Sequence, residues 1–118
     1  MPRFLIEVAY TPEAWAAQLE NPQNRMDVLK PFFDSVGAKV ETAYFAFGES
    51  DLIMIVSAPD NVSVAALSIS ASAGGALKSV KTTPLMAVEE GLEALRKGAR
   101  ARAAFVAPGK NLSGAVRN

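Results

Sequence analysis

Five consecutive apolar residues, Leu52 to Val56, follow directly on the polar turn Gly48-Glu49-Ser50-Asp51. Successive side chains of a strand point to opposite faces, so Leu52, Met54 and Val56 would share one face and leave the two isoleucines between them on the other. An antiparallel strand with one face in water should instead alternate apolar and polar residues. The run therefore predicts a strand that is covered on both faces.

The rest of the chain predicts the order β-α-β-β-α-β with one further helix. Alternation and β-branched or aromatic residues predict strands over residues 3–10, 39–47, 52–58 and 77–86. Helical spacing, capping residues and helix-stopping glycines predict helices over 12–20, 25–36, 61–73 and 88–101. This order favours an α+β ferredoxin-like sandwich, in which a four-stranded antiparallel sheet of strand order 4-1-3-2 carries its helices on one face.

Such a sheet leaves its second face without a helix, and the apolar run requires that this face be covered. Two covers are consistent with the sequence. A second copy of the chain can pack on this face about a two-fold axis, or the C-terminal helix can fold across it. We expect the first, a homodimer, with assembly beyond the dimer left open.

Composition excludes several classes of chemistry. The chain has no Cys and no His, so it has no disulfide, thiolate nucleophile, Ser-His-Asp triad or Cys- or His-ligated metal. It also has no phosphate-binding glycine motif, and we expect no metal and no cofactor. No apolar stretch approaches the length of a membrane span, and no signal peptide is evident, so we expect a cytoplasmic protein that does not bind membranes.

The charges are balanced over the whole chain but not along it. Twelve basic and twelve acidic residues give a formal net charge of zero, and residues 96–118 hold six bases and no acid. The favourable position of bases near the end of a helix explains much of this asymmetry. We therefore do not expect a nucleic-acid partner.

Several side chains are candidates for a small-ligand pocket. They are aromatic residues near the ends of predicted elements and polar residues on or beside predicted strands: Glu7, Tyr10, Trp15, Glu41, Tyr44, Phe47, Asp51 and Ser57. Ordinary core packing also accounts for the aromatic residues, and a backbone hydrogen bond that fixes the turn accounts for Asp51. We expect Gly48 to supply a positive φ to the same turn. If the open face is a dimer interior, we expect Glu7 to be at least half buried, with Lys78 or a base of the partner chain beside it.

Three segments resemble the GYD domain family of small bacterial proteins: "VAYTPE", "FGESDLIMIVSAPD" and "VKTTPLMAVEE". The resemblance covers roughly residues 1–95, and residues 96–118 then form the end of the last helix and a basic tail. The signature turn of the family has Gly, a variable residue, Tyr and Asp. Gly48 and Asp51 match it, and Ser50 replaces the Tyr. The resemblance implies a ferredoxin-like dimeric α/β barrel and, commonly, higher oligomers, but no catalytic residue.

Two functions remain open from the sequence. The first is a non-catalytic module that binds a small organic ligand or another protein and acts as a homo-oligomer. The second is a cofactor-independent enzyme of the small-barrel type, such as an oxygenase, that would use Tyr44, Trp15 or Asp51. The sequence shows no clear acid–base cluster, which argues against catalysis.

Overall fold

The computed structural model describes residues 1–109, which belong to two units. The first unit is Met1–Leu85, and the second begins at Met86. The predicted division after residue 95 stays a prediction, and the tail bases Lys110 and Arg117 lie outside the described residues. The first unit contains β1 (Arg3–Tyr10), α1 (Pro12–Glu20), α2 (Arg25–Asp34), β2 (Lys39–Phe45), β3 (Leu52–Ser57), α3 (Asn61–Ala73) and β4 (Leu77–Leu85).

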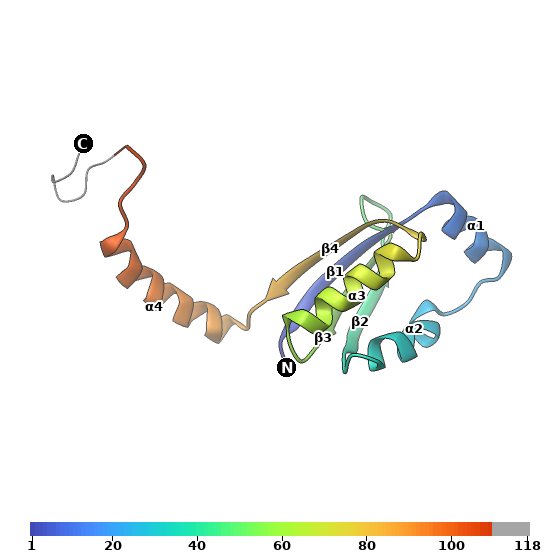
Figure 1. Ribbon diagram of the computed structural model, residues 1–118, viewed down its shortest axis with the longest axis horizontal. Helices are drawn as coiled ribbons and strands as arrows, with labels where there is room; N and C mark the ends of the chain where they lie inside the picture. Colours follow the sequence, from blue (N-terminus) through green and yellow to red (C-terminus); the bar gives the residue numbers. More distant parts are fainter. Residues whose placement is uncertain (110–118) are drawn as a thin grey trace. The chain divides into compact units, whose positions relative to one another are not determined.

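The four strands form one antiparallel sheet in the order β2-β3-β1-β4. This confirms the predicted α+β class and the predicted strand order, and it is compatible with a ferredoxin-like fold. β3 and β1, which contain most of the buried apolar residues, lie in the middle of the sheet. β2 and β4, which are more exposed, lie at its edges. In Figure 1, α3 lies across one face of this sheet.

Polar side chains start three of the helices where the sequence predicts them. The side chains of Thr11, Asn24 and Asp60 accept hydrogen bonds from backbone N–H groups in the first turns of α1, α2 and α3. These bonds satisfy donors that have no partner inside the helix. The caps at Thr11 and Asp60 therefore fix where the chain leaves β1 and β3, and the cap at Asn24 fixes where α2 begins after α1.

The core lies between that face and the helices. β1 and β3 contribute alternate residues, and α2 and α3 contribute large apolar side chains. Its most buried large members are Phe4, Ile6, Val8, Tyr10, Phe33, Leu52, Met54, Val56, Val64 and Leu67. Burial of such side chains removes apolar surface from water and stabilises the fold by about 1.5–3 kcal/mol for each of the larger ones.

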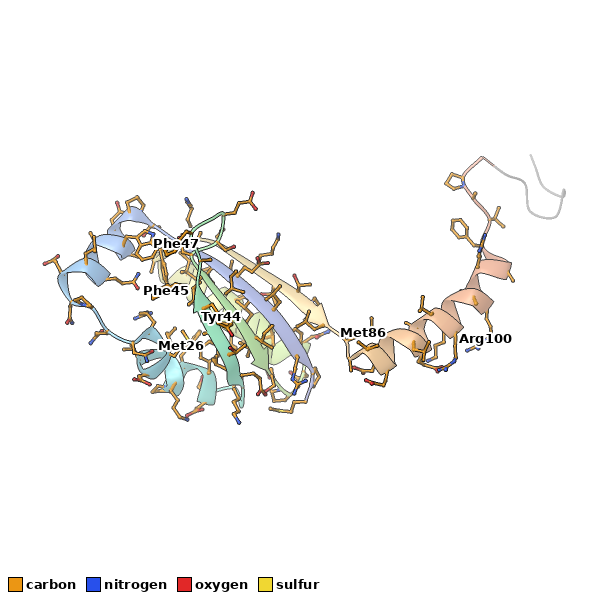
Figure 2. All side chains as sticks on the ribbon, turned by 180° about the vertical axis from the view of Figure 1, so that it is seen from behind. Met26, Tyr44, Phe45, Phe47, Met86 and Arg100 are labelled. Atoms are coloured by element: carbon orange, nitrogen blue, oxygen red, sulfur yellow. The ribbon has the colours of Figure 1, made fainter. Side chains whose placement is uncertain are left out.

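The opposite face of the sheet, which we call the open face, carries no helix of the first unit (Figure 2). Strand pairing places Glu7 beside Ile53 and Leu5 beside Ile55 on this face. Both isoleucines are only partly buried in the single chain. The predicted two-faced apolarity of β3 is therefore present.

β2 departs from the simple alternation that the sequence suggests. Strict alternation would place Val40 and Tyr44 on one face. The pairing with β3 shifts between Val40 and Thr42, so Val40 and Ala43 face the helices while Thr42 and Tyr44 lie on the open face. An extra residue in one strand of a pair reverses which side the next residues face.

The two connections around β2 differ in their glycines. Gly37, after α2, has a φ of +73°, the left-handed conformation that glycine adopts most readily. The prediction of a positive φ at Gly48 is wrong, because the glycines with positive φ in residues 1–109 are Gly37, Gly75 and Gly109. The hairpin from β2 to β3 therefore turns without left-handed backbone at Gly48.

The second unit contains α4 (Val88–Ala104), which is three residues longer than predicted. Its first turn is capped by a hydrogen bond from the Ala87 N–H to Oε1 of Glu90, at 3.0 Å. Val88, Leu92 and Leu95 are exposed on it. Among the helices of residues 1–109, none is long and apolar enough to cross a membrane.

Candidate functional site

A cavity of about 300 Å³ lies between the helix-covered face of the sheet, α2 and α3. β1 and β3 supply its floor, and the two helices supply its walls. Most of the lining is apolar, and it includes Ile6, Val8, Leu29, Phe32, Leu52, Met54, Leu67, Ala71, Leu77 and Val80. The volume is at the lower end of the range found for small-molecule sites.

Two polar side chains border this cavity where β1 ends and α2 begins. They are Tyr10, the last residue of β1, and Arg25, the first residue of α2. Burial raises the pKa of Tyr10, and the positive charge of the adjacent Arg25 partly opposes that effect. Tyr10 is therefore a neutral phenol near pH 7, beside a permanent positive charge.

Aromatic rings support Tyr10 from the side of α1. The ring centroids of Tyr10 and Trp15 are 5.1 Å apart in an edge-to-face arrangement, and those of Trp15 and Phe45 are 6.4 Å apart. Such pairs favour offset or edge-to-face geometry. The cluster holds the Tyr10 ring in place. Trp15 thus contacts Tyr10 but does not line the cavity.

Asp51 supports the same end of the sheet through the backbone. Its Oδ2 accepts a hydrogen bond from the Tyr10 N–H at 2.9 Å, and its own N–H donates to the Val8 carbonyl at 2.8 Å. Both bonds join the start of β3 to the end of β1. The side chain therefore fixes the backbone at Tyr10, across 41 residues of sequence, and is engaged there.

A hydroxyl pair lies between α3 and β4. The hydroxyl oxygens of Ser68 and Thr82 are 3.1 Å apart, and Ser68 lines the cavity. Since each hydroxyl already has a partner, the pair adds little polarity to the wall. The other polar side chain of the lining is the exposed Ser70, so charge enters the cavity at its Tyr10–Arg25 end.

The structure does not bring the eight candidate residues together. Tyr10 lines the cavity, and Trp15 and Asp51 adjoin it. Pairing places Glu7, Tyr44 and Ser57 with open-face residues, on the other side of the sheet. Glu41 lies at the β2 irregularity and is exposed, and Phe47 is fully exposed in the hairpin (Figure 2).

The open face also shows the neighbours of Glu7. Its cross-strand partners are Ile53 on β3 and Lys81 on β4. The expectation that Lys78 lies beside Glu7 is wrong, because the β1–β4 register pairs Glu7 with Lys81 and leaves Lys78 near the far end of β1. Glu7 is partly buried. No ion pair to Glu7 forms within the described part of the chain.

Arg25 is a cavity residue that the sequence did not predict. An arginine at the first position of a helix is ordinary, and no motif distinguishes it from a solvated charge. Arg25 lines the cavity because of the distance between α2 and α3, and packing sets that distance, not the local sequence. Within residues 1–109 no cluster of three or more potential metal ligands is present. The cavity itself is an apolar volume with one cationic, hydrogen-bonding end.

Comparisons with known proteins add one finding. A family model described as GYD domain matches residues 4–95 of the chain. No match was found among curated proteins or among solved structures.

Proposed function

Because the chain belongs to the GYD domain family, we propose that its domain is a non-catalytic module that binds a small organic ligand and works as a homodimer. The observation that carries the proposal is the apolar cavity of about 300 Å³ beneath α2 and α3. The cavity is partly open to solvent, so the apolar side chains that line it contact water when it is empty. An apolar ligand that fills it removes this surface from water.

The polar groups around the cavity support binding and not catalysis. Asp51 already accepts the Tyr10 N–H, and the pKa of Tyr10 is raised away from the neutral range in which a general base is effective. The alternative of a cofactor-independent enzyme stays a prediction. A cytoplasmic setting likewise stays a prediction from composition.

The test is a search for the ligand itself. Protein purified from its native host is examined by native mass spectrometry, and we expect a bound small molecule in addition to the protein mass. Ala71→Phe puts a large ring into the cavity wall and should abolish the additional mass. Ala65→Phe, on the exposed side of the same helix, should retain it. If the additional mass is absent, or persists in Ala71→Phe, the cavity is not the binding site.

The homodimer part of the proposal rests on the open face. Leu5, Ile53 and Ile55, which are partly exposed in the single chain, form its apolar centre. A second copy can cover this face about a two-fold axis, with each apolar centre packed on the other. The formal net charge of zero means that two copies do not repel each other strongly.

Replacement of one central side chain tests the dimer. Ile55→Glu puts a charge in the middle of the open face and should yield a monomer by light scattering behind a sizing column. Ile69→Glu adds the same charge to the outer side of α3, where the isoleucine is 69% exposed, and should leave the dimer intact. A parent protein that is monomeric both well below and well above micromolar concentration contradicts the dimer.

A further inference from the structure

Arg25 borders the cavity without an anionic partner. Its side chain is partly buried, and in residues 1–109 the ion pairs are Lys30–Asp34 and Glu93–Arg96. Glu20 and Arg25 both line a second, shallower depression of about 410 Å³ beside α1, yet they form no ion pair. A guanidinium removed in part from water, with no carboxylate beside it, favours an anion.

The donors at this end of the cavity outnumber the acceptors. Arg25 has five N–H donors and no acceptor, and the neutral Tyr10 phenol adds one O–H. The nearby Asp51 carboxylate already accepts the backbone N–H of Tyr10. A carboxylate would accept from the guanidinium by charge-assisted hydrogen bonds, which are stronger than those between neutral groups.

The remainder of the cavity restricts the body of such a ligand. Its walls are mostly Ile, Val, Leu, Met and Phe side chains, and the Ser68 hydroxyl is already paired with Thr82. The body is therefore apolar. A volume of about 300 Å³ lies at the lower end of the range for small-molecule sites, which favours a compact ligand.

We propose that the cavity takes a compact carboxylic acid, with an apolar or aromatic body among Leu29, Met54 and Leu67 and its carboxylate at Arg25 and Tyr10. This inference rests on the proposed ligand-binding function and adds the charge and size of the ligand. It assigns Arg25 as the residue that selects an anionic ligand over a neutral one of the same shape.

Two probes of nearly identical shape test the charge. Phenylacetate and phenylacetamide differ in their end group, and each is titrated into the full-length protein by calorimetry and by NMR of backbone amides. We expect phenylacetate to bind roughly tenfold or more tightly than phenylacetamide, because hydrogen bonds to charged groups contribute about 1.5–3 kcal/mol. The shifted amides should include those of Tyr10 and Ala71.

Two variants of one helix locate the preference. Arg25→Gln should abolish the preference for phenylacetate and leave phenylacetamide binding nearly unchanged. Lys30→Gln removes the same charge from an exposed position of α2 and should retain the preference. Arg25→Lys, which keeps the charge but not the planar donor group, should retain part of it.

The outcomes separate the inference from the proposed function. Equal binding of both probes to the parent protein, or a preference that survives Arg25→Gln, overturns the carboxylate assignment. Binding of neither probe also overturns it. The search for a native ligand by mass spectrometry is an independent experiment. If the parent protein carries no bound ligand there, that result counts against the proposed function itself.

Discussion

At the scale of single residues, the side chains around the cavity act mainly on one another. Asp51 holds the Tyr10 backbone, Trp15 packs on the Tyr10 ring, and Arg25 lies beside the Tyr10 hydroxyl. Tyr10, at the end of β1, is thus the residue that these three side chains have in common as a neighbour. Two of these three neighbours were candidates from the sequence, but their connection through Tyr10 requires the register of β1 and β3.

Loss of the Asp51 carboxylate leaves the partly buried Tyr10 N–H without its acceptor. Asp51→Ala should therefore lower the free energy of unfolding by about 1–3 kcal/mol, and Asp51→Asn, which keeps one acceptor oxygen, by less. Urea denaturation measures both. Glu49→Ala, at an exposed position of the same hairpin, is the control and should match the parent. Equal stability of Asp51→Ala and the parent would mean that this bond contributes nothing.

The raised pKa of Tyr10 predicts a loss of stability in alkaline solution. Burial makes the folded state hold the phenol proton to higher pH than the unfolded state, whose tyrosine titrates near its ordinary value of about 10. Above that pH the folded state binds more protons, so the free energy of unfolding falls as pH rises. Tyr10→Phe should fall less steeply than the parent between about pH 9 and about pH 11. Equal slopes for Tyr10→Phe and the parent over this range would contradict the prediction.

At the scale of elements, local sequence signals predict where the helices and strands lie along the chain. The same signals predict only part of how these elements pack on one another. The capping residues Thr11 and Asp60, the polar turn and the two-faced apolarity of β3 predict the order of elements and the strand order of the sheet. The β2 irregularity was not predictable, because it is a property of a strand pair and leaves no mark in β2 alone. The cavity was not predictable either, since it depends on the spacing of α2 and α3.

The connection from α2 to β2 gives a prediction at this scale. Gly37 has a φ of +73°, and a Cβ added there would lie 3.3 Å from Cγ of Pro59. Gly37→Ala should therefore lower the free energy of unfolding by about 1–2 kcal/mol. Gly48→Ala meets no atom within 4 Å and has no positive φ, so it should be neutral or slightly stabilising. If both variants have the same stability, the backbone at Gly37 imposes no requirement for glycine.

At the scale of the whole molecule, a homodimer has a stability that depends on concentration. Folded copies that bind each other withdraw material from the unfolded state, so the melting temperature rises with protein concentration. Differential scanning calorimetry over a hundredfold range should show this rise for the parent and for Ile69→Glu. Ile55→Glu should melt at one temperature throughout. A parent melting temperature that is independent of concentration contradicts the proposed assembly.

The alternation along β1 has a consequence for protein engineering. Its even-numbered residues Ile6 and Val8 face the cavity, while the odd-numbered Leu5 and Glu7 face the other side of the sheet. The two sets of positions can therefore be redesigned in separate libraries. Changes at odd positions could produce orthogonal pairs of chains that associate only with each other, and changes at even positions could retune the pocket. One short strand thus offers two independent design variables for a biosensor in which pairing and ligand detection are chosen separately.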